Sequence, residues 1–388
     1  MRTSVYFILP ESGITFSDQL QNCFKQVQNL TGETEGVSKK VVALTFFVGT
    51  ENQDQYKDFK NSINSSVEKV YGSFCPAVAC VAQAPENGNI VGVEVFLEQE
   101  ESNNIIYKQL EGTPYVVIEH ASFNEVYVLG LTGFIEGDIY ENSNTAFALM
   151  EKVLHAENLD FSNVVRQWNY IENITHIPDK NENLQHYQIF NDVRSKFYGK
   201  SDFINGYPSA TGIGTDNGGV VINFIAISNS PLNEIVPLMN PGQIDAHKYS
   251  QKVLVGAGVF EKEEKSCPKF ERGKMVKSDE GSKVYISGTA AIVGENTVHP
   301  TDVGKQTLTT INNIKNLTKS GNFPDRNDFQ SLENVDYSYV RSYVKHNKDI
   351  GIVKEICEKQ FNSQCFQYLI SDICRGNLLV EIEALIEF

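Results

Sequence analysis

The sequence lacks the patterns that usually mark a bound nucleotide or metal. It contains neither GxGxxG nor GxxxxGK[ST], and the Gly-rich stretch GIGTDNGG at 212–219 precedes the apolar strand VVINFIAI instead of a helix. A phosphate cradle needs a helix N-terminus behind its glycines, so we interpret this stretch as a turn. The seven histidines are scattered, and none forms HxH or HExxH. We therefore expect no metal site and no cofactor.

The sequence also lacks disulfide and membrane signals. Its seven cysteines are an odd number and include no CxxC, which favours a reduced, cytoplasmic compartment. The apolar run in MRTSVYFILPESG is too short for a signal peptide. No apolar stretch approaches the roughly 18 residues that a membrane span needs. We expect a cytoplasmic protein without a membrane segment.

Basic residues are scarce. The chain carries 33 Lys and Arg against 49 Asp and Glu, a net charge of −16, and the basic residues form no run. This balance argues against nucleic acid as a partner. It leaves room for a small anionic substrate in a pocket lined by a few arginines. With 388 residues, 41% of them hydrophobic, the chain is long enough for two or three domains.

Internal repetition is the most informative feature that is present. Two copies of a unit recur with their elements in the same order: strand, amphipathic helix, strand with an aromatic end, second helix, closing strands. The helical periodicity is clear in both first helices, at Phe147, Met150, Val153 and Leu154 in one copy, and at Leu308, Ile311, Ile314 and Leu317 in the other. The other matched segments are 126–133 with 284–291, 163–171 with 337–344, 184–199 with 349–361, and 207–227 with 366–386.

A third, partial copy lies at the front of the chain. Its strand is 41–49, its helix 55–72 and its closing strands 75–99, and its first half is interpreted as missing or degenerate. The repeats predict an N-terminal half unit at 1–120, a middle unit at 121–230, and a bridge plus C-terminal unit at 231–388. The charged run EKEEK in the bridge is expected to be a solvated loop.

The closing segment LLVEIEALI places two acids in an apolar strand. As an extended strand, it alternates between an apolar face and a face with Glu381 and Glu383 at its centre. A half-solvated strand would explain these acids simply. A functional carboxyl group is the alternative.

The repeated unit resembles the RidA/YjgF family, small proteins that form trimers with active sites between subunits. The resemblance rests on VYISGTAAI followed by QTLTTINNIKNL, and on LLVEIEA. It implies an α/β (α+β) fold of RidA/YjgF-like repeats, with mixed sheets packed on helices and an intramolecular pseudo-trimer. A chain of this kind is expected to be a monomer.

A longer series of motifs is similar to the chorismatase family (FkbO-like chorismate-converting enzymes). In order, these are VVRQWNYI, YQIFNDVR, YPSATGIG, FERG, ISGTA, VRSYV and ICRGNLLVEIEA, from about residue 120 to the C-terminus. The resemblance implies a cofactor-free enzyme of secondary metabolism that cleaves the enolpyruvyl ether of chorismate and releases pyruvate.

The first Glu of LLVEIE is the catalytic position that the resemblance implies, so Glu381 is the predicted general acid. Burial on an apolar strand would raise its pKa and keep it protonated. Glu383 is interpreted as structural, or as helping to hold that proton. The middle copy has Val221 and Asn223 at these two places. The first copy has Glu94 at the matching place, interpreted as a relic or a surface residue.

Arginine forks suit the two carboxylates of chorismate. Candidates at matching motif positions are Arg194, Arg272, Arg341 and Arg375, with surface salt bridges as the alternative role. The further substrate-binding candidates are Tyr170, Tyr187, Thr211, Gly212, Gly288, Thr289 and Ala291. For the two tyrosines and the small residues, core packing is the alternative. Trp168, the only Trp, is expected in the core.

Cys374, seven residues before Glu381, is the second predicted catalytic residue. In the family, a Cys at this place resembles the subtype that forms a hydroxybenzoate by eliminating water, with 3-hydroxybenzoate preferred here. A small buried hydrophobe is its alternative role. Ala291 suits instead the hydrolytic subtype, which gives a dihydroxycyclohexadiene carboxylate.

Two other functions stay open. RidA-like imine deaminases use an Arg about fifteen residues before the Glu, where this chain has Phe366, Gly206 and Ala79 in its three copies. A non-catalytic protein that binds a small ligand is the second alternative. It is favoured by lost basic residues, since His186, Gln188 and the PGQ segment (241–243) stand where the family commonly has arginines nearby.

Overall fold

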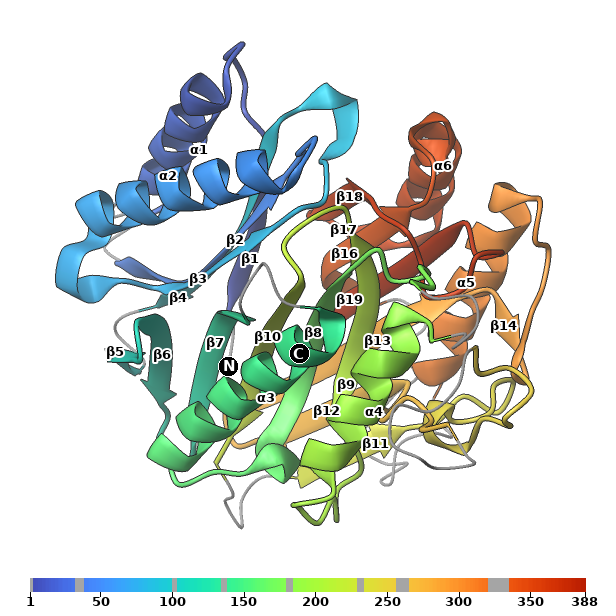
Figure 1. Cartoon of the computed structure of the whole chain (residues 1–388). Coiled ribbons are helices and arrows are strands. Elements are labelled where there is room, and N and C mark those ends of the chain that lie inside the picture. The colour runs from blue at the N-terminus through green and yellow to red at the C-terminus, as the bar shows by residue number, and fades with distance from the viewer. Residues whose placement is uncertain are drawn as a thin grey trace.

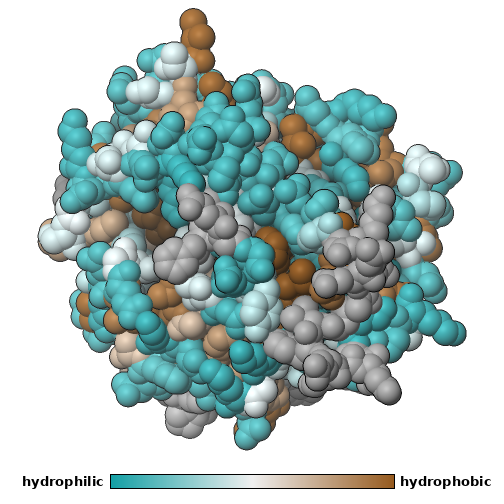
Figure 2. Space-filling view, in the orientation of Figure 1, coloured by the Kyte–Doolittle hydropathy of each residue, from teal (hydrophilic) through white to brown (hydrophobic). Residues whose placement is uncertain are grey.

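The computed structural model describes residues 3–31, 38–99, 103–133, 138–178, 184–228, 234–255, 265–319 and 335–388 (Figure 1). Within them, three larger mixed sheets follow one another along the chain, and a pair of helices packs against each. The predicted α/β class with mixed sheets on helices is confirmed. The described part of the chain contains no helix long and apolar enough to cross a bilayer. The face in Figure 2 is mainly hydrophilic, with hydrophobic residues in small separate patches.

The first sheet has the strand order β1–β4–β2–β3, in which β2 and β3 are parallel and the other pairs antiparallel. Thr15 starts α1 with a capping box, which satisfies free amides of the first turn. Ile63 and Val67 of α2 pack on this sheet. The elements are β1 (Ser4–Ile8), α1 (Phe16–Leu30), β2 (Lys39–Val48), α2 (Gln53–Tyr71), β3 (Ala77–Val81) and β4 (Val91–Gln99).

The middle sheet has the order β5–β6–β7–β10–β8–β9. Phe147, predicted on the apolar face of its first helix, packs against Phe190 and Phe197 at ring-centroid distances of 5.5 and 5.4 Å. The elements are β5 (Asn104–Leu110), β6 (Thr113–Glu119), β7 (Asn124–Thr132), α3 (Ile139–Ala156), β8 (Val164–Glu172), α4 (His186–Tyr198), β9 (Ser209–Thr215) and β10 (Val220–Ile227).

The third sheet has the order β11–β12–β13–β19–β16–β17, and β18 also pairs with β16. Its strands are β11 (Glu234–Leu238), β12 (Gly273–Ser278), β13 (Gly281–Ala290), β16 (Asp336–Val344), β17 (Asn362–Ser363), β18 (Phe366–Ile370) and β19 (Val380–Glu387). Its helices are α5 (Val303–Leu317) and α6 (Ile350–Gln360), and a separate small hairpin is formed by β14 (Ile292–Val293) and β15 (Asn296–Thr297). The bridge run at 261–264 and residues 256–258 of VLVGAG lie outside the described residues.

The repeat is visible in the strand order. β7, β10, β8 and β9 neighbour one another as β13, β19, β16 and β18 do in the third sheet. At the front of the chain, β1 and α1 occupy the places of the strand and helix that we expected to be missing. Residues 104–119, assigned from the sequence to the N-terminal half unit, form β5 and β6 and pair within the middle sheet. The division into three domains stays a prediction.

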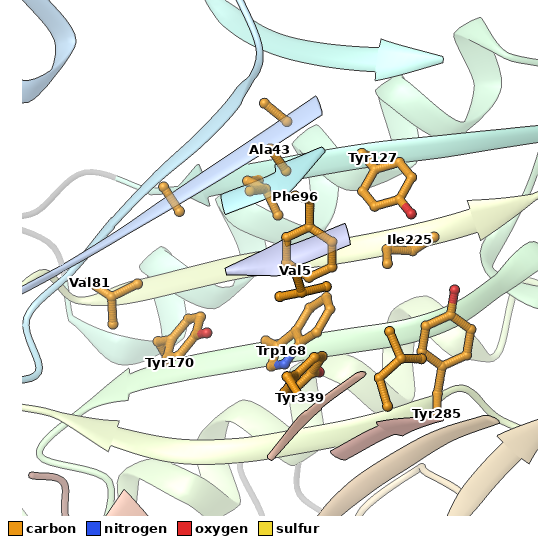
Figure 3. Close-up of a cluster of buried hydrophobic side chains, with 14 of the residues drawn as sticks. Val5, Ala43, Val81, Phe96, Tyr127, Trp168, Tyr170, Ile225, Tyr285 and Tyr339 are labelled. Carbon is orange, nitrogen blue, oxygen red and sulfur yellow. The ribbon is translucent and has the colours of Figure 1, made fainter. Parts of the chain in front are cut away.

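The inner faces of the three sheets meet in one shared core, drawn in Figure 3. Val5 and Phe96 come from the first sheet, Tyr127 and Trp168 from the middle sheet, and Tyr339 from the third, and all five are buried. Three outer cores lie between the sheets and their helices, one core for each sheet. Because each sheet is covered on both faces, its strands are apolar on both.

The C-terminal strand β19 belongs to this buried arrangement. Val380, Ile382 and Ala384 point into the outer core under α5 and α6, as the alternation predicts. Glu381 and Glu383 point to the opposite side and are 4% and 0% exposed. The half-solvated interpretation of this strand is therefore wrong, because its second face abuts the other sheets and not water.

A glycine in β7 marks how closely two units approach. Gly130 has a φ of +76°, and a Cβ atom at this position would collide with the Val78 carbonyl oxygen of β3. A side chain would meet backbone there, and backbone has no rotamer by which to move aside. Glycine is thus required by both its conformation and its neighbour.

We predict that Gly130→Ala lowers the free energy of unfolding by about 2–4 kcal/mol. Gly112→Ala is the matched control, since Gly112 also has a positive φ, +81°, but no atom lies within 4 Å of its added Cβ. The control should cost only about 1 kcal/mol, the conformational part alone. Urea unfolding of both variants measures the difference, and equal losses would contradict the close approach.

Candidate active site

A cavity lies between the middle and third sheets. Its walls come from β9 and α4 on one side and from β13 and β19 on the other, and the bridge closes it with residues 249–255. Polar lining residues are Gln185, Tyr187, Gln188, Asn191, Tyr249, Arg272, Cys374, Arg375 and Glu381. Small or apolar lining residues are Ala210, Gly212, Val253, Leu254, Val255, Pro268, Phe270, Gly288, Ala290 and Ile292.

The edge strand β9 docks on a bulge of β13, and this contact forms the floor of the cavity. The pairing of β13 with β19 shifts register between Ile286 and Thr289. At the bulge, the Ser287 hydroxyl accepts a hydrogen bond from the Ala210 amide (2.9 Å) and donates to the Glu271 carbonyl (2.6 Å). The next amide, of Gly288, donates to the Thr211 hydroxyl at 3.0 Å. A bulge re-aims backbone groups in this way, and here it joins the two sheets.

Glu381 occupies the centre of this floor. It lies opposite Ala290 on β13 and Tyr343 on β16. Its carboxyl group sits directly over Gly288, where a Cβ atom would overlap it. Burial raises the pKa of Glu381 to about 8, with the charge of Glu383 adding to the effect and Arg166 and Arg272 opposing it. The carboxyl group is therefore mostly protonated at neutral pH.

Glu383, two residues further on the same face, has the opposite character. Its carboxylate pairs with Arg166 at 2.7 Å and Arg341 at 3.0 Å, and accepts hydrogen bonds from the Trp168 indole at 2.8 Å and from the Thr211 hydroxyl. Burial alone would raise its pKa, but the two guanidinium groups and these donors outweigh it and lower the pKa below the ordinary value. Two neighbouring carboxyls thus differ in charge because their partners differ.

Two arginines bring positive charge to the cavity. Arg272 donates to the Ile244 carbonyl at 2.7 Å and to the Tyr249 hydroxyl at 2.6 Å. The guanidinium carbon of Arg272 lies 5.5 Å from the Tyr249 ring centroid, and that of Arg375 lies 5.3 Å from it. Neither arginine has a carboxylate partner among the described residues, so both have capacity to bind an anion.

Comparison with known proteins shows similarity to chorismatases. A family model described as chorismatase FkbO/Hyg5-like, N-terminal, matches residues 98–226. A 3-hydroxybenzoate synthase of Streptomyces hygroscopicus is 28% identical over 256 residues, which cover 64% of this chain and 70% of that protein. A chorismatase of Streptomyces rapamycinicus is 28% identical over 236 residues, covering 59% and 65%. A crystal structure of a chorismatase matches 100% of this chain and 99% of its own, with a TM-score of 0.69 at 21% identity. The chain is therefore similar in sequence to chorismatases, and it shares the fold of one.

Cys374 borders the cavity, in the segment that precedes β19. Burial raises the pKa of its thiol to about 12, and the nearby Glu381 carboxyl adds to the shift. The group is thus a neutral thiol at physiological pH, which makes it a weak donor and not a thiolate nucleophile. Tyr187 lines the opposite wall, with its ring against Gly212, where a Cβ would lie 3.0 Å from it.

The structure brings together seven of the residues named from the sequence. Glu381, Cys374, Tyr187, Gly212, Arg272, Gly288 and Arg375 all line the cavity. Thr211 does not line it, but its hydroxyl links the Gly288 amide to Glu383 directly beneath.

The other candidates lie elsewhere. Arg341 and Tyr170 belong to the central core, where Arg341 is fully buried among Glu94, Glu383 and Gln367. Arg194 lies behind the cavity wall and donates to Asn191. The Thr289 hydroxyl donates to the Ser287 carbonyl at 2.8 Å. Ala291 is buried outside the cavity, and Ala290 takes its place, because strand alternation puts Ala290 and not Ala291 on the face of Glu381.

Several residues that line the cavity were not predicted from the sequence. Asn191 lies within the motif YQIFNDVR, and Gln185 directly precedes α4, but neither was named as a candidate. Tyr249 lies in the bridge, which has no counterpart in the middle copy, so the repeat could not place it. Gln188, noted as a departure from the family, does line the cavity, whereas His186 turns away and hydrogen-bonds the Glu172 carbonyl at 2.8 Å. Burial lowers the pKa of His186, which keeps it neutral.

The strand register corrects the position of Glu94 within the repeat. Strand register puts Val221 opposite Tyr170, as Glu381 is opposite Tyr343, so Val221 does stand at the place of the acid. In the first sheet, Gly92 is opposite Phe47 and takes this place. Glu94 therefore matches Glu383. It is 2% exposed and pairs with Arg341, so its interpretation as a surface residue is wrong.

The residues present supply no metal site. No group of three or more His, Cys, Asp and Glu side chains suited to a metal occurs in the described ranges. The cavity instead combines one protonated carboxyl group, two arginines and a neutral thiol. This set can donate a proton and bind an anion.

Proposed function

We propose that this chain is a chorismatase that cleaves the enolpyruvyl ether of chorismate and releases pyruvate, with Glu381 as the general acid. The observation that carries the proposal is the protonated Glu381 carboxyl group in a cavity with two arginines that have no carboxylate partner among the described residues. The similarity to a protein named chorismatase and to one named 3-hydroxybenzoate synthase supports the substrate.

The first step is protonation of the vinyl methylene carbon. Glu381 gives its proton to this carbon, and an oxocarbenium ion forms at the ether carbon. The acid must be neutral when the substrate arrives, and burial provides this. Once it has given its proton, the Glu381 carboxylate lies beside the new positive charge and stabilises it.

Water then adds to the oxocarbenium carbon. Glu381, now a carboxylate, accepts the proton from this water, and the resulting hemiketal breaks its bond to the ring oxygen to release pyruvate. The acid is regenerated for the next cycle. The products at this stage are pyruvate and a dihydroxycyclohexadiene carboxylate, and one water has been consumed.

The preferred ring product is 3-hydroxybenzoate. Loss of one water from the ring gives the aromatic acid, so the net reaction converts chorismate to pyruvate and hydroxybenzoate without consuming water. We assign the control of this step to Cys374, which borders the cavity beside Glu381. In the proposed complex, Arg272 and Arg375 bind the two substrate carboxylates, and Tyr249 keeps both guanidinium groups in place.

The imine deaminase alternative has less support. Phe366, at the place where that reaction would need an arginine, packs in the outer core of the third sheet and not in the cavity. The charged groups that do reach the cavity suit a dianion.

Glu381→Gln should reduce pyruvate release from chorismate at least about 100-fold, because glutamine cannot donate the proton. Glu387→Gln, on the same strand but outside the cavity, is the control and should retain activity. Pyruvate is quantified enzymatically and the ring products are separated by chromatography. Wild-type protein without pyruvate release above the Glu381→Gln background would overturn the proposal.

The pH profile tests the state of Glu381. Because the acid must carry its proton, kcat/KM should be constant below its pKa of about 8 and fall about ten-fold per pH unit above it. Glu383→Gln removes a neighbouring negative charge and leaves Arg166 without its carboxylate partner, so both effects lower the pKa of Glu381. The descending limb should move to lower pH in this variant. A limb that stays in place would show that Glu383 does not act on the acid.

Cys374→Ala should change the product more than the rate. We expect pyruvate release within about ten-fold of wild type, since the thiol is not the acid, and a shift of the ring product from 3-hydroxybenzoate to the dihydroxycyclohexadiene acid. Cys357→Ala, buried in the outer core, is the control. An unchanged product ratio in Cys374→Ala would refute the assigned role.

A further inference from the structure

The cavity that holds Glu381 has a counterpart between the first and middle sheets. This second cleft is lined by β3, α2 and β7, the elements that match β9, α4 and β13 in the order of the repeat, and by the β5–β6 hairpin. It encloses about 660 Å³. Strand register places Val78 and Thr132 of the second cleft where Ala210 and Ala290 line the first.

The helices match in the same way. α2 and α4 are both followed directly by glycine, at Gly72 and Gly199, each after a tyrosine. Aligning these ends puts Lys60 at the place of Tyr187 and Asn64 at the place of Asn191, and both line the second cleft. The second cleft therefore presents an ammonium group where the first presents a phenol.

The floors of the two clefts differ. In the first, Gly288 leaves space for the Glu381 carboxyl group. In the second, the Val78 carbonyl oxygen occupies the space beside the matching Gly130. The Gly130 amide donates to the Asn223 side chain at 2.8 Å. Val221 stands at the place of the acid and is buried in the central core. The second cleft thus cannot protonate a ligand as the first can, but it remains open above this floor.

The charge of Lys60 is not compensated by the protein. No hydrogen-bond acceptor or carboxylate partner of its ammonium lies among the described residues, whereas Lys108 and Glu111 at the rim pair with Glu157 and Lys152. Burial lowers the pKa of Lys60, with the nearby Cys80 thiol opposing the shift. A bound anion would restore the electrostatic partner that a partly buried ammonium requires.

We propose that the cleft between the first and middle sheets is a second, non-catalytic binding site for a small organic carboxylate, held by Lys60 and Asn64. The proposal does not depend on the reaction at Glu381, since it rests on the geometry of the repeat and on Lys60. The anionic ligand class follows from the Lys60 ammonium in the cleft, and the missing acid means that binding there is not followed by proton transfer.

The test is the stoichiometry of 3-hydroxybenzoate binding to the full-length chain by isothermal titration calorimetry. Wild type should bind two equivalents, and Arg272→Met should lose the one in the first cleft. Lys60→Met should weaken the other at least about ten-fold, because a hydrogen bond to a charged group is removed. Lys69→Met, on the exposed side of the same helix and outside the cleft, is the matched control.

Pyruvate release by Lys60→Met in the absence of added hydroxybenzoate should equal that of wild type, which separates this site from the catalytic one. Lys60→Arg should retain the second equivalent, which excludes a loss through misfolding. One wild-type equivalent that is lost in Arg272→Met and kept in Lys60→Met, or two unchanged equivalents in Lys60→Met, would overturn the proposal. Failure of the chorismate assay would leave this binding result readable, since 3-hydroxybenzoate is titrated directly.

Discussion

A buried network of charges at the meeting point of the three sheets is the constraint on which the rest depends. Arg341 of the third sheet pairs with Glu94 of the first and with Glu383 of its own sheet, and Arg166 of the middle sheet pairs with the same Glu383. All four side chains are at most 3% exposed. Removing one partner of such a group leaves a buried charge uncompensated, at a cost of about 3–5 kcal/mol. The network therefore specifies how the three units meet.

The same network explains how two acids on one strand differ. Glu383 is satisfied by cations and donors, and it stays charged. Glu381, two residues away, faces a cavity whose nearest cations are directed elsewhere, since Arg166 binds Glu383 and Arg272 binds Tyr249 and the Ile244 carbonyl. Its neutral form is then preferred, because a second negative charge in this place would be both desolvated and repelled. The charged Glu383 and the burial of the site together keep the Glu381 carboxyl group neutral, so that it can donate a proton.

The sequence predicted the elements well because the repeat doubled each signal. The helix around Phe147 and the strand carrying Glu381 were recognised twice, once in each copy, and hydrophobic periodicity alone then fixed their faces. The site was predicted less completely. Arg341 is in a motif that resembles the family's, but a motif does not say whether an arginine faces a cavity or a core. Tyr249 was missed because its segment has no repeat, and Glu94 was misplaced by two residues because the alternation of a strand does not by itself fix its register.

The three copies differ in the side chains at two matched positions of their closing strands, and the surroundings of each position explain the difference. The central position keeps a polar side chain in every copy, because each satisfies a buried polar group that would otherwise be left unpaired. Glu94 and Glu383 pair with arginines of a neighbouring sheet, and Asn223 accepts from the Gly130 amide of its own sheet. The position two residues earlier has no such shared requirement, because only Glu381 lines a cavity, whereas Val221 lies in the central core and Gly92 packs against Phe7 and Pro85. There the copies hold Gly92, Val221 and Glu381. The proposed proton transfer needs an acid at this place in one copy only, which agrees with the single acid among these three positions.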